Sequence, residues 1–144
     1  MPQRMVSSII EDQKVITCTA HVTVTKAAQL MQQSDIGAIM VTEQGRLVGI
    51  FTERDALFRV IAQGRDANAS RLSDVMTPSP QSVEPTKRFG HALHMMYEGG
   101  FRHVPVVDDG RPIGMISARD LLGPELEQFV VEVRQREHIL EILG

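Results

Sequence analysis

Apolar and polar positions alternate along this chain in a block that occurs twice. Residues 36–55 contain an apolar run, a short polar turn, a second apolar run and a polar segment, and residues 101–120 repeat that order. Two apolar runs joined by a glycine-containing turn predict a β-hairpin, and the polar segment behind each hairpin predicts the start of a helix. The two blocks align without a gap, so the sequence predicts a duplicated, pseudo-symmetric unit. The coinciding pairs are Gly45 and Gly110, Arg46 and Arg111, Gly49 and Gly114, Arg54 and Arg119, and Asp55 and Asp120.

A helix with the same apolar spacing is expected before each hairpin. Apolar residues recur there at intervals of three and four, which is typical of a helix that buries one face. Thr23 is expected to cap the first helix, whereas Arg88 stands at the corresponding position of the second, which should therefore fray more at its start. The two faces are Val24, Ala27, Ala28, Leu30 and Met31, and Phe89, Ala92, Leu93, Met95 and Met96.

The segments around these elements complete each half. A short helix is expected within residues 1–13, an extended segment from Val15 to Thr23, and a further helix from Asp55 to about Gln63. The order in each half is therefore extended segment, helix, strand, strand, helix. This order predicts a mixed α/β (α+β) fold.

Three divisions of the chain follow from the duplication. The first repeat, with the N-terminal helix, should take residues 1–68, the second repeat residues 69–123, and a C-terminal amphipathic helix residues 124–144. Pro124 suits the first turn of a helix, because the N–H that it lacks would have no partner there. The apolar face of this last helix needs a surface to pack against. That face consists of Leu126, Phe129, Val130, Val133, Leu140 and Leu143.

Composition and charge narrow the possible functions. The chain has 144 residues, of which 42% are hydrophobic and 23% charged, as in an ordinary soluble protein. Its net charge of -3 gives no general attraction to nucleic acid or to an anionic membrane, and no apolar run is long enough to span a bilayer. The single cysteine, Cys18, and the absence of an apolar leader favour a reducing, cytoplasmic setting. Cys18 itself is interpreted as a small buried hydrophobe.

Catalytic and metal-binding patterns are absent from the sequence. No nucleophile, base and orienting residue have a spacing that supports catalysis, and there is no glycine-rich phosphate loop. His91 and His94 are three residues apart on an expected helix, but they align with Lys26 and Gln29 of the first copy, which indicates a solvated face. We therefore expect neither an enzyme nor a required metal.

The duplicated unit resembles the CBS domain, named for cystathionine β-synthase, in its usual tandem pair, the Bateman module. The resemblance covers nearly the whole chain. It implies two β-α-β-β-α units packed sheet to sheet about a pseudo-twofold axis, with clefts that bind adenosyl ligands such as AMP, ADP, ATP or NAD. It also implies a stand-alone regulatory protein that forms a homodimer and signals to an effector protein. The motifs that carry it are Gly37-Ala38-Ile39-Met40-Val41, Gly45-Arg46-Leu47-Val48-Gly49-Ile50 and Thr52-Glu53-Arg54-Asp55 in the first copy, and Asp74-Val75-Met76-Thr77, Arg102-His103-Val104-Pro105-Val106-Val107-Asp108, Gly114-Met115-Ile116 and Ser117-Ala118-Arg119-Asp120 in the second.

The resemblance assigns residues from both halves to each cleft. Each cleft takes its aspartate from one copy and much of its wall from the other. In the Asp120 cleft, Val15 and Ile16 would lie at the adenine, with Gly37 and Ala38 on the wall. The expected ligand-binding residues are Val15, Ile16, Gly37, Ala38, Met115, Ser117, Arg119 and Asp120 in that cleft, and Thr52, Arg54, Asp55, Pro80, Gln81, Arg102 and His103 in the mirror cleft, the Asp55 cleft.

Two interpretations of the Thr/Ser-x-x-Asp segments stay open. An ionised aspartate only accepts hydrogen bonds, which suits ribose hydroxyls, and a hydroxyl with free backbone N–H groups suits a phosphate. The same pattern is also a capping box, which needs no ligand, and the two roles can coexist. Arg102 and His103 likewise either attract a phosphate, from either cleft, or only form a solvated entry to their strand.

Among the function classes, a nucleotide-sensing regulatory module is favoured. The alternative is a structural dimerisation module with unoccupied clefts. A third class, nucleic-acid binding through scattered arginines, is disfavoured by the acidic balance; these residues are Arg54, Arg65, Arg71 and Arg88. Of the two clefts, we expect the Asp120 cleft to bind more tightly, because Gly37 and Ala38 leave room for adenosine, whereas Pro80 lacks a donor and Phe101 is bulky.

Overall fold

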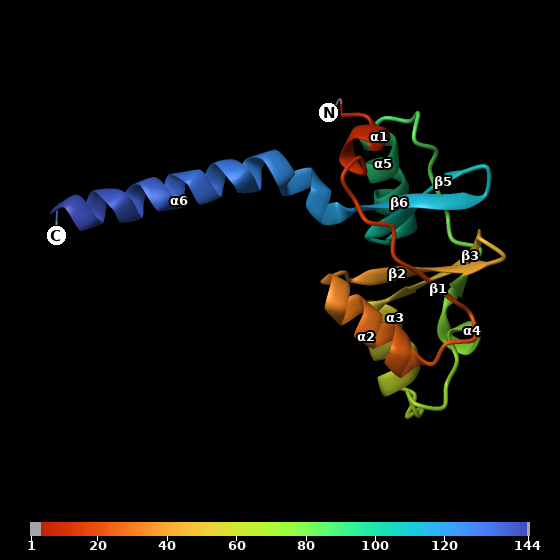
Figure 1. The fold of residues 1–144 in the computed structure, drawn as a ribbon. Helices are drawn as coiled ribbons and strands as arrows, with labels where there is room; N and C mark the ends of the chain where they lie inside the picture. Colours follow the sequence, from red (N-terminus) through yellow and green to blue (C-terminus); the bar gives the residue numbers. More distant parts are fainter. Residues whose placement is uncertain (1–3, 144) are drawn as a thin grey trace.

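Two similar lobes stack through their sheets, and one long helix leaves the body of the molecule (Figure 1). The structure is a computed structural model that describes the backbone of residues 4–143 and the side chains of residues 4–123, 129 and 131–143. The helices are α1 (Val6–Ile9), α2 (Val24–Ser34), α3 (Glu53–Asp55), the π-helix η1 (Ala56–Ile61), α4 (Leu72–Val75), α5 (Phe89–Gly99), the 3-10 helix η2 (Ala118–Leu122) and α6 (Gly123–Leu143). The strands are β1 (Thr17–Thr19), β2 (Ala38–Glu43), β3 (Arg46–Thr52), β4 (Thr77–Pro78), β5 (His103–Asp108) and β6 (Arg111–Ser117).

The sheets confirm the expected order of elements in both halves. The first sheet has the order β1-β2-β3-β4, with β1 parallel to β2 and β2 antiparallel to β3. The second sheet pairs β5 with β6 in antiparallel, and Val83 forms a parallel bridge to Val106 of β5. Val83 therefore occupies in the second half the place that β1 occupies in the first. Strand β4, which belongs to the second repeat in sequence, pairs with β3 of the first repeat, so the chain crosses between the lobes.

The two hairpin turns have the same conformation and contact each other's repeat. Gln44 and Gly45 have φ values of 52° and 77°, and Asp109 and Gly110 have φ values of 51° and 78°, which is the pattern of a type I′ turn. A Cβ atom added at Gly45 would collide with the Arg111 guanidinium, and one added at Gly110 would collide with that of Arg46. The Leu47 N–H also donates to the Gly110 carbonyl at 3.0 Å. The turns therefore help to join the two repeats about their pseudo-twofold axis.

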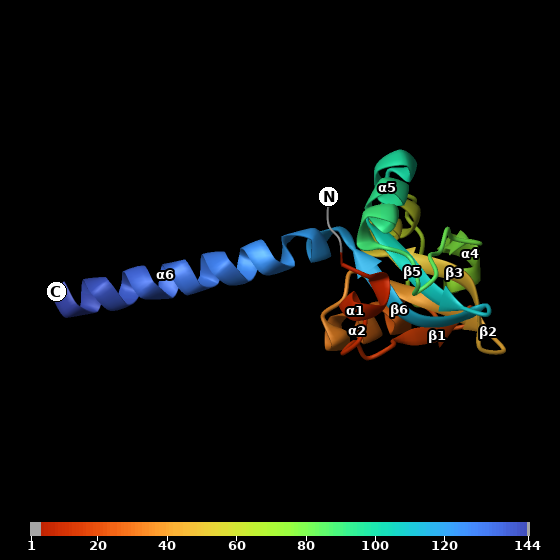
Figure 2. The same ribbon diagram turned by 90° about the horizontal axis from the view of Figure 1, so that it is seen from above.

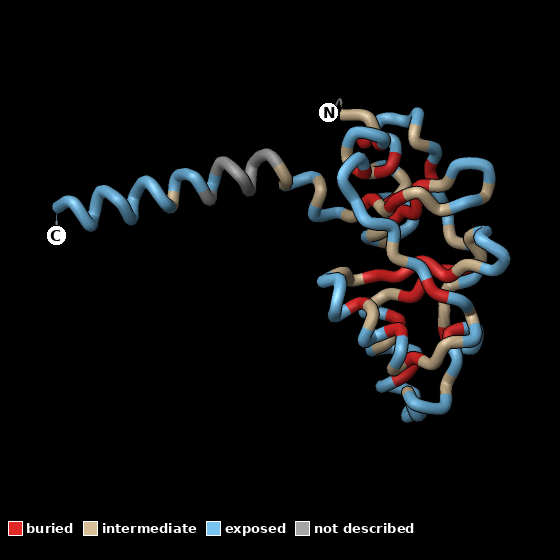
Figure 3. Tube along the Cα trace, in the orientation of Figure 1, coloured by how far each residue is buried: buried red, intermediate tan, exposed pale blue. Residues whose placement is uncertain are grey.

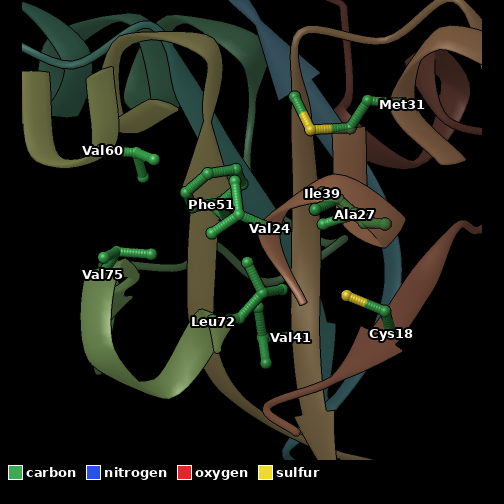
Figure 4. Packing of buried hydrophobic residues seen from close by; sticks show 10 residues of the cluster. All are labelled: Cys18, Val24, Ala27, Met31, Ile39, Val41, Phe51, Val60, Leu72 and Val75. Carbon is green, nitrogen blue, oxygen red and sulfur yellow. The ribbon is translucent and has the colours of Figure 1, made fainter. Parts of the chain in front are cut away.

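Each lobe has its own apolar core, and the chain exchanges a helix between them. The first core lies between α2 and the first sheet (Figure 4), and it also receives Leu72 and Val75 of α4. The second core lies under α5 and receives Val6 and Ile10, from α1 and the residue after it. The N-terminal helix thus packs with the second lobe, beside α5 (Figure 1). The division of the repeats at residues 1–68 and 69–123 stays a prediction about the duplicated sequence.

The two matching helices begin as predicted. The Thr23 side chain accepts a hydrogen bond from the Lys26 N–H at 3.2 Å, while Arg88 provides no side-chain cap to α5. Val24, Ala27 and Met31 are buried on α2, as the spacing predicts. Ala28 is exposed, contrary to the expectation, because it lies at the edge of the apolar face on the helical wheel. The second face is buried or half-buried throughout, with Phe89, Ala92 and Met96 at its centre.

The segment from Asp55 to Gln63 differs from the single regular helix expected. Three residues of α-helix are followed by the π-helix η1, in which the Ala62 N–H donates to the Leu57 carbonyl at 2.9 Å. The wider π turn changes which residues share a face. Of its apolar side chains only Val60 is buried, whereas Leu57, Phe58 and Ile61 are 50%, 56% and 69% exposed. The result is an exposed apolar surface beside the first lobe.

Helix α6 extends from the lobes into solvent, and its described side chains are mostly exposed (Figures 1 to 3). Of the expected apolar face, Phe129, Leu140 and Leu143 are exposed and Val133 is half-buried, while the side chains of Leu126 and Val130 lie outside the described residues. Val131, Ile139 and Ile142 are also exposed and lie off that face, so the expectation of a single apolar face is wrong. No helix in the described part of the chain combines the length and apolarity that crossing a bilayer would need.

Candidate ligand-binding clefts

Both Thr/Ser-x-x-Asp segments cap the helices that follow the hairpins. The Asp55 Oδ2 atom accepts from the Thr52 N–H at 3.0 Å, and the Thr52 hydroxyl accepts from the Asp55 N–H at 3.1 Å. In the second copy, the Asp120 Oδ2 atom accepts from the Ser117 N–H at 2.8 Å and from the Ser117 hydroxyl at 3.5 Å. The capping interpretation is therefore confirmed. It leaves the ligand role open, because a carboxylate has two oxygens and about four acceptor sites.

The two aspartates differ in how much of the carboxylate remains available. Asp55 is buried, and its Oδ1 atom lies 3.5 Å from the Arg59 Nε atom. Asp120 is half-buried, and its Oδ1 atom has no hydrogen-bond partner among the described residues. A hydroxyl donor can therefore reach Asp120 without displacing a cation, whereas a donor at Asp55 would compete with Arg59.

Each aspartate lies at a cleft between the two lobes. A cleft of about 560 Å³ contains Asp120, and one of about 780 Å³ contains Asp55. The first brings together all eight residues expected there, namely Val15, Ile16, Gly37, Ala38, Met115, Ser117, Arg119 and Asp120. The second brings together all seven of its expected residues, namely Thr52, Arg54, Asp55, Pro80, Gln81, Arg102 and His103. Residues from both repeats line each cleft, and their roles toward a ligand stay predictions.

Equivalent backbone hydrogen bonds place the helix starts beside the strands of the same repeat. The Glu53 N–H donates to the Gly37 carbonyl at 3.0 Å, and the Ala118 N–H donates to the Arg102 carbonyl at 2.9 Å. Each bond ties the residue after the Thr or Ser to the residue just before β2 or β5. Because each repeat gives its aspartate to one cleft and its wall to the other, each bond fixes the acidic helix start of one cleft relative to the wall of the other cleft.

The structure adds lining residues that the sequence patterns did not single out. Lys14 and Gln13 precede the extended segment, and the end of α2 contributes further polar groups. The only feature of the sequence that could have indicated Lys14 as a cleft residue was its position next to Val15. The Asp55 cleft also includes apolar side chains of η1, which a regular helix would have placed differently. The added residues are Gln13, Lys14, Gln33, Ser34, Asp35, Ile36, Met40 and Gly114 in the Asp120 cleft, and Ile50, Glu53, Leu57, Phe58, Thr77, Ser79, Gly99, Gly100 and Phe101 in the Asp55 cleft.

Gln13 joins the segment that carries Val15 and Ile16, the residues expected at the adenine, to strand β6. Its Nε2 atom donates to the Met115 carbonyl at 2.8 Å, and its Oε1 atom accepts from the Met115 N–H at 2.9 Å. In the Asp55 cleft, the corresponding residue Ile50 pairs with the backbone of Thr77 in β4. The side-chain amide of Gln13 therefore replaces a strand pairing. It fixes the chain immediately before Val15 and Ile16.

The sizes of the two clefts do not support the steric reason given for tighter binding in the Asp120 cleft. The Asp55 cleft is the larger, although Pro80 and Phe101 line it. A Cβ atom added at Gly37 would lie 3.2 Å from the Glu53 Oε1 atom, so the space left by this glycine is occupied in part by a carboxylate. The steric argument for a roomier Asp120 cleft is therefore wrong. The order of affinities stays a prediction, now resting on the freer carboxylate of Asp120.

His103 has an unusual position, because it lines both clefts. Burial lowers the pKa of its imidazole, Glu53 and Asp120 oppose that effect, and Arg102 adds to it. Burial also raises the pKa of the Cys18 thiol to about 11, in agreement with its interpretation as a buried hydrophobe. Among the described residues, no three His, Cys, Asp or Glu side chains are grouped to hold a metal ion.

Comparison with protein families gives two matches to one family model. The model of the CBS domain matches residues 6–62 and 72–124. The CBS domain-containing protein CBSX3, mitochondrial, of Arabidopsis thaliana is 36% identical over 123 residues, which are 82% of this chain and 60% of that protein. The CBS domain-containing protein YhcV of Bacillus subtilis is 37% identical over 108 residues, which are 75% of this chain and 76% of that protein. The chain thus spans about 60% of the length of the plant relative.

Solved structures with this fold include proteins with different bound groups. A putative signal-transduction protein with CBS domains from Burkholderia ambifaria is 33% identical, with a TM-score of 0.78 over 85% of this chain and 94% of that one. The CBS domain pair of protein MJ0100, in complex with 5′-methylthioadenosine and S-adenosyl-L-methionine, is 23% identical, with a TM-score of 0.78 over 88% and 99%. Hypoxic Response Protein I, with two coordinated zinc ions, is 28% identical, with a TM-score of 0.70 over 81% and 95%.

Proposed function

Because this chain belongs to the CBS-domain family, we propose that it is a regulatory module that binds an adenosyl ligand in the clefts between its two repeats. The ligand is of the AMP, ADP, ATP or NAD class, and binding is reported to an effector protein through conformation or assembly. Relatives in this family are typically regulatory modules rather than enzymes.

The observation that carries this proposal is the convergence of both repeats on each cleft. The Asp120 cleft has its carboxylate on η2 of the second repeat and its opposite wall at Gly37 and Ala38 of the first. A ligand held there contacts both lobes at once. It therefore favours the relative orientation of the lobes in which both sets of contacts form, which is a population shift.

The chemistry of the cleft suits an adenosine. The free Oδ1 atom of Asp120 is an acceptor for ribose hydroxyls, and Val15 and Ile16 offer backbone and apolar surface to an adenine. Arg119 and Lys14 line the same cleft and provide positive charge for a phosphate. The MJ0100 complex supports the idea that this fold accommodates adenosyl groups, although its 23% identity relates the two proteins by fold alone.

We further propose that the protein acts as a homodimer. Exposed apolar side chains of the described residues include Leu57, Phe58 and Ile61 on η1 and several residues of α6, among them Phe129. In an isologous dimer each such surface would be covered by its counterpart on a second copy.

A thermal-shift panel tests the proposed function. The full chain is heated with AMP, ADP, ATP, NAD, NADH or S-adenosylmethionine, with inorganic phosphate as the anion control. A ligand at a hundred times its dissociation constant should add about 2.7 kcal/mol to the free energy of unfolding. Stabilisation by at least one adenosyl compound but not by phosphate supports the proposal. No stabilisation by any of them, with a dimer still present, would instead favour a structural dimerisation module.

A further inference from the structure

His103 lies where the two clefts meet. It is the residue that lines both of them in the described part of the chain. The corresponding residue of the first repeat, Ala38, lines only the Asp120 cleft. The pseudo-symmetry of the molecule is therefore broken by one imidazole at the first position of β5, where its backbone pairs with Ser117 at the end of β6.

Charged groups from both sides face this imidazole. Glu53 acts on it from the start of α3 in the Asp55 cleft, Asp120 from η2 in the other, and Arg102 from the preceding position of the chain. Burial outweighs the two carboxylates and lowers the pKa of His103, so the ring is mainly neutral near pH 7 when both clefts are empty. The other charged groups that line the clefts are Arg54 and Asp55 on one side, and Lys14, Asp35 and Arg119 on the other.

We propose that His103 couples the two clefts, because an anionic nucleotide bound in one draws a proton onto the shared imidazole and thereby raises the affinity of the other for a second anion. The inference rests on the proposed function and concerns its regulation.

The sign of the coupling follows from the charge. A neutral imidazole has one donor and one acceptor nitrogen, and protonation turns both into donors and adds a positive charge. A phosphate in either cleft favours the protonated ring. Once the first ligand has caused protonation of His103, the second ligand binds next to an imidazolium cation. The free energy of proton uptake has then already been supplied by the first ligand. The coupling through His103 disappears at low pH, where the imidazole is already charged without a ligand. It also disappears at high pH, where the imidazole stays neutral even with a ligand bound.

Proton uptake can be measured by titration calorimetry of the full chain with AMP in buffers of different ionisation enthalpy at pH 7.5. Because the AMP phosphate itself titrates near pH 6, the comparison is between wild type and His103→Gln. Wild type should take up more protons than His103→Gln, and adenosine, which lacks the phosphate, should show no difference between them. His91→Gln is the matched control, because His91 is an exposed histidine of α5 that lines neither cleft. It should behave like wild type.

The coupling itself follows from a mutant cycle. The affinity of the Asp55 cleft for AMP is measured in two proteins. In wild type the Asp120 cleft is filled with AMP, and in Asp120→Ala that cleft is disabled. We expect filling the Asp120 cleft to favour AMP binding in the Asp55 cleft about fivefold more in wild type than in the His103→Gln background.

The outcomes separate the two proposals. If AMP and the other nucleotides fail to bind, the proposed function fails and this inference fails with it. If AMP binds but fills one cleft only, or fills both with equal proton uptake and equal coupling in wild type and His103→Gln, the proposed function stands and the role of His103 is overturned.

Discussion

At the scale of single residues, the two cap aspartates have the same structural role but different freedom to bind. Both accept a backbone N–H at the start of a helix. Asp55 is additionally held by Arg59, whereas one oxygen of Asp120 has no partner among the described residues. This difference, and not the volume of the clefts, is the basis for expecting the Asp120 cleft to bind more tightly.

The first prediction tests that order. Asp120→Ala should remove the stronger of two AMP binding events and weaken it about 10-fold or more, because a hydrogen bond to a charged group contributes roughly 1.5–3 kcal/mol. Asp55→Ala is the matched variant, since it removes the equivalent cap from the other helix, and it should leave the stronger event in place. Isothermal titration of both variants decides the order. Loss of the stronger event in Asp55→Ala alone would reverse it.

The second prediction concerns the amide of Gln13, which joins the chain before Val15 to β6 through two hydrogen bonds. Gln13→Ala should weaken AMP binding in the Asp120 cleft severalfold and leave the Asp55 cleft unchanged, because Val15 and Ile16 lose their anchor. The loss of stability should be small, about 1–2 kcal/mol for two partly solvated bonds. Gln63→Ala serves as the control, since Gln63 is exposed and lies outside both clefts. Equal AMP affinities in the two variants would contradict the anchoring role.

At the scale of elements, the sequence predicts the features that depend on neighbouring residues. It does not predict the features that depend on contacts between distant parts of the chain. The hairpins, their turns, the Thr23 cap and the two cap aspartates follow from neighbouring residues, and all are present. The residues of the two clefts were assigned by the resemblance to the CBS domain and not by a local pattern, and the structure brings them together as that resemblance implies.

The elements that the sequence did not predict depend on distant contacts. The packing of α1 in the second core and the pairing of β4 with β3 leave no periodic signal in the sequence. Both depend on contacts with residues of the other repeat. The π-helix η1 has the apolar composition of an ordinary helix, and its irregular turn is not apparent from spacing. The affected cleft residues, such as Phe58, were missed for the same reason.

The third prediction tests the exchange of α1. A Cβ atom added at Gly114 of β6 would lie 2.7 Å from the Cβ and Cγ2 atoms of Ile10, so Gly114→Ala should push Ile10 out of the second core. Overpacking of this kind costs about 1–3 kcal/mol. At Gly123 the added Cβ would lie 3.8 Å from its nearest neighbour, an Arg4 nitrogen, so Gly123→Ala should be neutral or slightly stabilising. Chemical denaturation measures both. Similar stabilities would show that Ile10 does not pack closely on β6.

At the scale of the whole molecule, the structure is a pair of lobes with sheets facing each other, clefts between them and apolar surface left uncovered. The uncovered residues include those of η1 and several along α6, which leaves the body of the molecule (Figure 3). Large exposed apolar surfaces mark interaction sites in soluble proteins. Leu57 and Phe58 of η1 also line the Asp55 cleft, so this part of the uncovered surface adjoins a candidate ligand site.

The fourth prediction concerns assembly. Deleting residues 124–144 should dissociate the homodimer or lower its solubility, because the apolar side chains of α6 are exposed in a single chain. Light scattering of the full chain and of the shortened one measures the change, with AMP binding as the control for an intact fold. A full-length chain that stays monomeric at high concentration would refute the homodimer.

The central claim is that both clefts bind an adenosyl ligand through its ribose hydroxyls and the cap aspartates. The most direct measurement is a calorimetric titration of the wild-type chain and of the Asp55→Ala, Asp120→Ala double variant with AMP and with its 2′,3′-dideoxy analogue. We expect wild type to bind AMP at least about 10-fold more tightly than the dideoxy analogue, and the double variant to bind both equally weakly. Equal affinity of wild type for the two nucleotides, or undiminished AMP binding by the double variant, would contradict the account.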